Sequence, residues 1–260
     1  MIIDLKIAEH SYFYGFAQAD GSLYETTRNR GKLSIELSER DESLLLEFQN
    51  IFPVKSHISK RTRDTNFKDN HTSVTFTIHD WDFRKELKVL GFPNKSKSLI
   101  IGPPNGEYSE IDYIRGIIDG DGSLGLTSKD IPFLSLVTVS ESLKDYYINF
   151  LFNITGKLKK PSRNKRDDAY NIMINKEDAK LVVSKLYYND CFCLPRKLEK
   201  SKDVMSWVRP QNMKKITGRK KWTDEDDNTI TTLSLEEAIK ETGRTEQSIK
   251  MRLWRLSNSK

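Results

Sequence analysis

The chain has 260 residues, 37% hydrophobic and 31% charged, which is typical of a globular protein that folds as one large domain or two ordinary ones. Its net charge of +6 favours a polyanionic partner, and no apolar run approaches the roughly 18 residues of a membrane-spanning helix. The opening stretch, Met1 to Lys6, lacks the order of a secretion signal. We therefore expect an intracellular protein, in a cytoplasm, an organelle matrix or a phage-infected cell, with no membrane partner.

The first predicted helix covers Tyr12 to Ser22 and carries two small residues, Gly15 and Ala19, four positions apart on one face. A face of this kind lets the backbone of another helix come close. The helix closes on Asp20 followed by glycine, although a carboxylate is unfavourable there because the C-terminus of a helix carries partial negative charge. A bound divalent cation would explain the carboxylate.

Two β-hairpins and two helices follow in alternation. Leu23 to Ser38 holds two candidate strands around a basic turn, and Asp41 is expected to cap a helix that ends at Pro53. Val54 to Ile78 is predicted to form the second hairpin, and Asp80 to Leu90 the next helix. The segment after it, residues 94–109, contains the Pro, Asn and Gly residues that are typical of a linker.

The same order of elements then begins again. Tyr113 to Ser123 repeats the small-residue face with Gly116 and Gly120, and it closes on Asp121. Two helices packed by these faces would bring Asp20 and Asp121 together. Such a pair of like charges is the chemistry expected of a divalent metal site.

The elements after the second motif match those after the first. They are a strand from Phe133 to Val139, a helix through Leu143 to Leu151, a basic hairpin from Lys157 to Ile174, a helix from Glu177 to Tyr187, and an apolar turn that ends at Pro195. A whole α-β-β-α-β-β-α order is not expected to repeat by chance. We infer two homologous halves, 1–102 and 111–208, joined by a linker at 103–110.

A third unit, at 222–260, follows a basic linker at 209–221. Its predicted helices begin at Trp222, run from Leu235 to Glu241, and run from Thr245 to Leu256. The last helix would turn Ile249, Leu253 and Leu256 inward and leave Lys250, Arg252 and Arg255 on its outer face. Three short helices with a basic final helix favour a helix-turn-helix module.

The duplicated motif and the elements after it resemble the single-chain, two-repeat LAGLIDADG homing endonucleases over roughly residues 10 to 207. The family motif falls on Phe13 to Gly21 and on Ile114 to Gly122, which places its acidic metal ligand on Asp20 and Asp121. The resemblance implies an α+β fold in which two curved antiparallel sheets form a saddle over DNA. It also implies a monomer that cuts both strands with Mg²⁺ and leaves short 3′ overhangs.

The resemblance also suggests supporting catalytic residues. Lys95 and Lys197 follow matching prolines and are candidates for stabilising charge on the attacked phosphate or polarising a water, although ordinary surface lysines are the alternative. Glu36 lies where relatives keep a polar group near the attacking water, and the second half offers Val137 or Thr138 there. Gln18 replaces a motif aspartate that Asp119 retains, at a position that caps and packs. We therefore expect two unequal active sites.

Basic residues of the hairpins are candidates for contacting DNA, with a solvated charged face as the alternative for any single one. They are Arg28, Arg30, Lys32, Lys55, Lys60, Arg61, Arg63, Lys157, Lys159, Lys160, Arg163, Lys165 and Arg166, joined by Lys250, Arg252 and Arg255 of the third unit. That unit resembles Myb-like modules through Trp222, Glu225 and Asp227 and the stretch from Gly243 to Arg252. An ordinary helical bundle is the alternative.

These features predict a site-specific, intron-homing endonuclease that hydrolyses both strands of double-stranded DNA with Mg²⁺. Two alternatives keep the scaffold: a group I intron maturase that binds RNA, and a DNA-binding regulator that does not cleave. A calcium loop at Asp119 to Leu124 is rejected, because its sixth position requires glycine and holds Leu124. Cys191 and Cys193 are expected to be buried thiols rather than zinc ligands.

Overall fold

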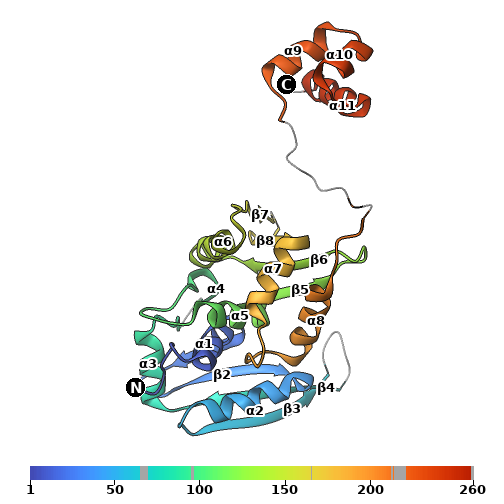
Figure 1. Cartoon of the computed structure of the whole chain (residues 1–260). Coiled ribbons are helices and arrows are strands. Elements are labelled where there is room, and N and C mark those ends of the chain that lie inside the picture. Colours follow the sequence, from blue (N-terminus) through green and yellow to red (C-terminus); the bar gives the residue numbers. More distant parts are fainter. Residues whose placement is uncertain (65–69, 95–96, 165, 212, 214–220, 259–260) are drawn as a thin grey trace. The chain divides into compact units, whose positions relative to one another are not determined.

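The computed structural model describes residues 1–64, 70–94, 97–164, 166–211, 213 and 221–258. Its contacts divide the chain into two compact units, Met1–Arg209 and Pro210–Lys260 (Figure 1). No helix in the described part of the chain is long and apolar enough to cross a membrane. The boundaries expected within the first unit, at 102 and 111, stay predictions.

The first half of the larger unit begins with the first motif helix and builds one antiparallel sheet of strand order β1-β2-β4-β3. Its elements are α1 (Ala8–Asp20), β1 (Gly21–Glu25), β2 (Gly31–Ser38), a 3₁₀ turn (Glu39–Asp41), α2 (Glu42–Ile51), β3 (Ser56–Arg63), β4 (His71–Ile78), α3 (Trp81–Val89) and α4 (Lys97–Ile100). The alternation of apolar and polar residues along β2 gives this sheet one buried face and one open face.

The second half repeats that arrangement with the sheet order β5-β6-β8-β7. Its elements are α5 (Glu110–Asp121), β5 (Gly122–Leu126), β6 (Pro132–Thr138), α6 (Glu141–Thr155), β7 (Ser162–Arg163), β8 (Tyr170–Asn175), α7 (Lys176–Leu186) and α8 (Pro195–Ser206). The duplicated order and the α+β class predicted from the sequence are therefore confirmed.

The apolar turn expected to end at Pro195 does so, because this proline is the first residue of α8, where its fixed φ suits a helix start. Two other local expectations were wrong. The segment expected to be a linker contains the short helix α4. Asp41 precedes α2 without capping it, and its carboxylate instead accepts a hydrogen bond from Nε of Arg196 at 3.0 Å.

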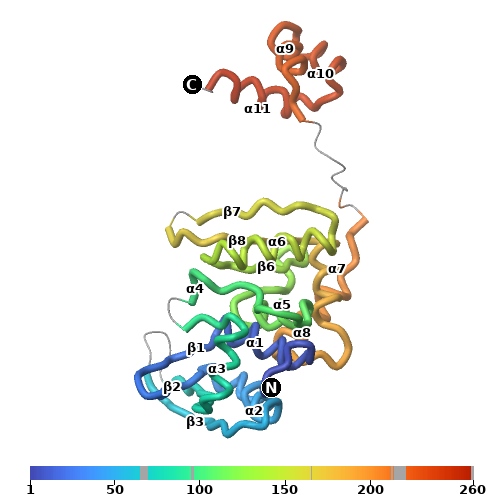
Figure 2. The backbone as a smooth tube through the Cα atoms, turned by 90° about the vertical axis from the view of Figure 1, so that its left-hand side faces the viewer, coloured from blue at the N-terminus to red at the C-terminus, as the bar shows by residue number. Residues whose placement is uncertain are grey.

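Helices α1 and α5 pack against each other at the centre of the unit, between the two sheets (Figure 2). A Cβ on Gly15 would lie 2.2 Å from the carbonyl oxygen of Tyr113, and one on Gly116 would lie 2.2 Å from that of Tyr12. No side chain fits either place. The small-residue faces predicted from the sequence are thus what allows the two backbones to touch.

Each sheet packs one face on helices and leaves the other open. The packed face of the first sheet carries Leu33, Ile35, Val74 and Phe76, and that of the second carries Leu134, Leu136, Ile172 and Ile174, all fully buried. Residues of the opposite parity form the two open faces. They are Ser22, Tyr24, Lys32, Ser34, Glu36, Ser38, His57, Ser59, Arg61, Arg63, His71, Ser73, Thr75 and Thr77 in the first sheet, and Ser123, Gly125, Phe133, Ser135, Val137, Ser162, Asn171, Met173 and Asn175 in the second.

The smaller unit holds α9 (Asp224–Thr232), α10 (Leu235–Thr242) and α11 (Glu246–Ser257) around a small apolar core. Ile249 is fully buried in that core, whereas Leu256, which was expected to point inward, is exposed. Ser234 caps α10 through a reciprocal capping box.

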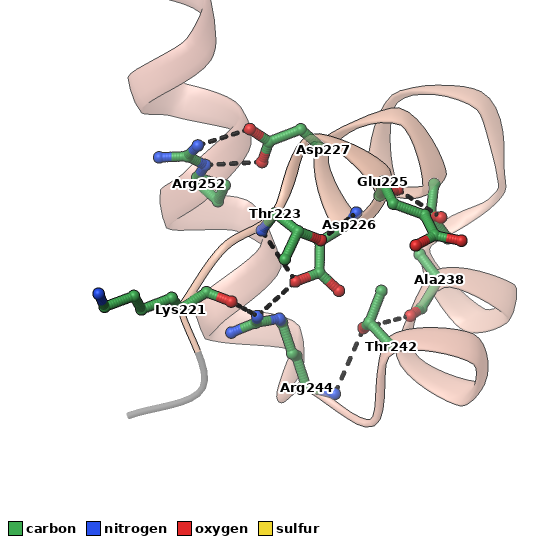
Figure 3. A network of polar contacts seen from close by, with 10 residues as sticks. Lys221, Thr223, Glu225, Asp226, Asp227, Ala238, Thr242, Arg244 and Arg252 are labelled. Carbon is green, nitrogen blue, oxygen red and sulfur yellow. Dashed lines mark hydrogen bonds and ion pairs between the residues drawn. The ribbon is translucent and has the colours of Figure 1, made fainter. Parts of the chain in front are cut away.

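Polar contacts supplement this small core (Figure 3). The Arg244 guanidinium donates to the carboxylate of Asp226 at 2.6 Å and stacks on Trp222, with its central carbon 3.9 Å from the ring centroid. Arg252 of α11 binds both carboxylate oxygens of Asp227 in α9. These ion pairs join helices that bury few apolar side chains, so they contribute to holding the unit together.

Candidate active site

Asp20 and Asp121 are the last residues of α1 and α5, and a strand begins directly after each of them. Because the two helices pack so closely, the two carboxylates lie near each other. A Cβ on Gly120, the residue before Asp121, would lie 3.5 Å from Oδ2 of Asp20. Among the described residues, no group of three or more His, Cys, Asp and Glu side chains forms a self-contained metal site. Asp20 and Asp121 are the residues that could hold a cation here.

The protein raises the pKa of both carboxyl groups. Each side chain keeps one side in solvent, but the neighbouring helix ends remove enough water to raise its pKa. The negative charge of Asp20 raises the pKa of Asp121 further, while the positive charges of Lys97 and Lys197 oppose both shifts. Two carboxylates held together in this way are destabilised until a cation joins them.

Lys97 is the lysine of the first half that reaches this site. Its ammonium group donates to the carbonyl oxygen of Ala19, one residue before Asp20, and burial lowers its pKa. It lines an open cavity of about 340 Å³ together with Gln18, Ala19 and Asp121. Lys95, the residue expected here, lies outside the described residues.

Lys197 of the second half also reaches the site, but it is almost fully buried. Its ammonium group donates to the carbonyl oxygens of Ile118, of Asp119 at 2.8 Å and of Gly122 at 2.9 Å. Burial lowers its pKa to about 8, against the charge of Asp119, which raises it. A cation in this position satisfies the carbonyl groups that end α5 and complements the helix dipole.

The residues one turn back from the site differ between the halves. The buried Asp119 carboxylate accepts hydrogen bonds from the hydroxyl groups of Tyr12 at 2.7 Å and Tyr187 at 2.6 Å, and from the backbone N–H of Leu194. Gln18, its counterpart, accepts one from the hydroxyl of Tyr113 at 2.7 Å. Both side chains thus pack within the helix interface.

The strand registers fix the counterpart of Glu36. Gly21, after the first motif aspartate, pairs with Ile35, and Gly122, after the second, pairs with Leu136. Ile35 and Leu136 are therefore equivalent, and so are the residues that follow them, Glu36 and Val137. Val137 is 48% exposed and lines the same cavity as Asp121. Thr138 is buried on the packed face. The carboxylate of Glu36 is paired with Arg63 at 3.3 Å.

Sequence reasoning did not single out Arg196. This residue lies beside Lys197, and its positive charge lowers the pKa of Asp20, opposing the effect of burial. Its guanidinium is held by the buried Asp41 of the first half, at 3.0 and 3.1 Å. Its position next to Lys197 was the one feature of the sequence that could have indicated a place near the site.

Most of the first-half candidates for DNA contact are exposed, but they do not share one face. Arg28 and Arg30 lie in the β1–β2 turn, Lys32 and Arg61 lie on the open face, and Lys55 precedes β3. Lys60 has the parity of the packed face and binds Glu39 and Glu42 near α2. The structure therefore does not bring Lys60 to the open face.

The basic residues of the second half are mostly bound to neighbouring acids. Lys157 and Lys159 both bind Asp178 of α7. Arg163 and Arg166 bind Asp168 and Asp167. Lys160 is exposed, and Lys165 lies outside the described residues.

In the smaller unit, Lys250 and Arg255 of α11 are exposed, the former in an ion pair with Glu246. Arg252 is held by Asp227 and is not available on the outer face as expected.

No protein-family model and no curated protein sequence matches the chain. Solved structures do match it. The homing endonuclease I-WcaI bound to its DNA recognition sequence is 15% identical, with a TM-score of 0.52, over 76% of this chain and 87% of that one. The chain has the LAGLIDADG fold.

Two further solved structures are similar to the chain at lower TM-scores. I-SmaMI bound to an uncleaved DNA target in the presence of calcium ions is 13% identical, with a TM-score of 0.41, over 68% of this chain and 80% of that one. Full-length DUF199/WhiA from Thermatoga maritima is 12% identical, with a TM-score of 0.43, over 94% and 88%. Within the LAGLIDADG fold, the two motif helices of this chain are α1 and α5.

Proposed function

We propose that the protein is a site-specific endonuclease that hydrolyses both strands of double-stranded DNA with Mg²⁺ and leaves short 3′ overhangs. One observation carries the proposal: α1 and α5 bring two exposed carboxylates together at their negative ends, beside Lys97 in an open cavity. The LAGLIDADG fold supports a DNA partner, because I-WcaI with that fold is bound to its recognition sequence.

The site residues have distinct tasks in this proposal. Asp20 and Asp121 offer the hard oxygen ligands that hold Mg²⁺, which when bound neutralises phosphate charge and lowers the pKa of a water. Lys97 places a second positive charge beside the phosphate without being locked in the interior. Glu36 would accept a proton from the attacking water in one site, and its counterpart Val137 has no group that can do so.

The remaining assignments follow from the same scheme. A single chain supplies both carboxylates, so we propose an active monomer that serves intron homing. The unit at 222–260 would add contacts through the outer face of α11, as a Myb-like helix-turn-helix module. The open faces of the two sheets would lie along the duplex.

Selection of cut sites from a random DNA library in Mg²⁺ tests the proposal. We expect one enriched, long target, and we expect the variant with both Asp20→Asn and Asp121→Asn to bind it without cutting. Asp82→Asn, which removes an exposed carboxylate on α3, is the matched control and should cut normally. Terbium luminescence gives a readout independent of cleavage, because the paired Asn changes should also abolish ion binding.

Two outcomes would contradict the proposal. Cleavage that survives the paired Asn changes would exclude these carboxylates from the chemistry. Specific DNA binding without any cleavage would favour a regulator, whereas preference for intron RNA over duplex DNA in a competition assay would favour a maturase.

A further inference from the structure

The open faces of the two sheets differ at positions that the strand registers make equivalent. Ser34 pairs with Thr77 in the first sheet, and Ser135 pairs with Met173 in the second, so Met173 stands where the first sheet has Thr77. By the same comparison, Phe133 stands where the first sheet has Lys32. Val137 replaces Glu36, as described above.

These three replacements all go from polar to apolar, and they lie together. Val137 and Phe133 are on β6, and Met173 is on the neighbouring strand β8. Val137 is 48% exposed, Met173 is 49% exposed, and Phe133 is half-buried. We call these three residues the apolar row. Between them, Ser135 keeps the serine of the first sheet.

Exposed apolar side chains on an open sheet face are unfavourable in water, where alternation normally places polar residues. The apolar row is also continuous with the candidate active site, because Val137 lines the cavity that holds Lys97 and Asp121. An occupant of that cavity that extends along the sheet would therefore cover the row.

Several basic side chains of the second half are already engaged in ion pairs with the protein's own acids. This favours an occupant that the second sheet recognises through apolar contacts rather than through salt bridges. Lys157, Lys159 and Arg163 are bound to Asp178 and Asp168, and Arg163 also stacks on Tyr170, which has the parity of the packed face. In the major groove, the one base group that calls for apolar contact is the C5 methyl of thymine.

We propose that the second sheet recognises its half of the DNA target through thymine methyl groups, whereas the first sheet uses polar and charged side chains. The target is then asymmetric, with thymines at the positions under Phe133, Val137 and Met173. This inference rests on the proposed function, because it requires a duplex in contact with both open faces.

Replacement of thymine by deoxyuridine tests the inference, because uracil keeps every hydrogen-bonding group of thymine and lacks only the methyl. All thymines of the selected target are replaced in one half at a time, and binding is measured without cleavage in Ca²⁺. We expect one half to lose affinity about fourfold for each contacted methyl, and the other half to change less than twofold.

Variants then assign the sensitive half to the second sheet. Met173→Thr introduces the residue that the first sheet has at this position, so it should weaken binding to the thymine target and reduce the effect of deoxyuridine. Leu181→Thr removes a similarly exposed apolar side chain from α7, away from the sheet face, and should change neither quantity.

The outcomes separate this inference from the proposed function. Cleavage of the selected target with no effect of deoxyuridine in either half would overturn methyl recognition and leave the endonuclease intact. Sensitivity in one half that Met173→Thr does not reduce would also overturn it, and would indicate that the apolar row contacts another partner. Failure to select any bound DNA would refute the endonuclease itself.

Discussion

Lys97 and Lys197 reach matching helix ends, but their ammonium groups are held differently. Lys97 is half-buried and donates to one carbonyl oxygen, that of Ala19, whereas the buried Lys197 donates to three at the end of α5. The first arrangement leaves donor capacity for a phosphate, because an ammonium group has three N–H donors. The second uses that capacity to close a helix.

Substitution should separate these two roles. We expect Lys97→Gln to slow single-turnover cleavage by about 100-fold with little change in thermal stability, because it removes a charge beside the phosphate. Lys197→Gln should slow cleavage and also cost about 2 kcal/mol of unfolding free energy, since buried carbonyl groups lose their donor. Lys202→Gln, at an exposed position of α8, is the control. Normal cleavage by the Lys97→Gln protein would show that this lysine does not take part in the reaction.

The sequence led to Lys95 rather than Lys97 for a simple reason. Counting from Pro195 reaches Lys197 in two steps, and the same count from Pro93 reaches Lys95. The first half needs four steps, because α4 begins at Lys97, whereas α8 begins at Pro195 itself. By contrast, Asp20 and Asp121 could be found from sequence, since the glycine after each fixes the helix end.

Burial of Asp121, with the negative charge of Asp20 as the second cause, predicts a pH-dependent stability. Because the pKa of Asp121 is raised in the folded protein, the folded state holds its proton more tightly, so this carboxylate lowers stability as the pH rises above the ordinary value of 3.8 and does so fully once the pH exceeds the raised pKa. Without metal, Asp121→Asn should raise stability at pH 7.5 by on the order of 0.5 kcal/mol. The gain should narrow as the pH falls toward the ordinary aspartate value of 3.8.

Thermal unfolding of both proteins in EDTA, at pH 7.5 and near pH 4.5, measures this difference. Added Mg²⁺ should stabilise only the protein with both aspartates, because ligand binding to the folded state raises its stability. A stability gain of equal size at both pH values would show that the ionised carboxylate of Asp121 is not its source.

At the scale of elements, α1 and α5 form both the core of the larger unit and the frame of its site. A methyl group on Gly116 would meet the backbone of Tyr12 and Phe16, at 2.2 and 2.7 Å, and backbone cannot turn aside as a side chain can. We therefore expect Gly116→Ala to cost about 3 kcal/mol and to reduce cleavage more than DNA binding.

Chemical denaturation and cleavage assays on the same samples test this expectation. Gly156→Asn is a suitable control, because that glycine ends α6 in the left-handed region with open space around it, and asparagine tolerates this conformation. A stable, fully active Gly116→Ala protein would mean that the helices can separate without disturbing the carboxylates.

The helices and strands could be predicted where the periodicity of apolar residues was strong. Local details could not be predicted where one residue type fits two structural roles. The alternation in β2 and the repeated motif helices placed both sheets correctly. The turn that ends at Pro195 was placed correctly, but α8, which begins there and packs on α7 and β5, was not predicted. Asp41 looked like a helix cap, and its partner, Arg196, lies 155 residues away.

For the whole molecule, the separate unit at its C-terminal end carries the last prediction. A chain ending at Arg209 keeps all of the described residues of both sheets and of the helix pair, so it should cut the same phosphates as the full chain. If α11 binds phosphates through residues such as Lys250, truncation should weaken binding about 10- to 100-fold at physiological salt. It should also make the plot of log affinity against log salt shallower, because fewer counterions are released.

Filter binding at several NaCl concentrations, with Lys250→Gln in the full chain as the intermediate case, measures both effects. Identical affinities and salt slopes for the truncated and the full chain would show that this unit does not contribute to DNA binding.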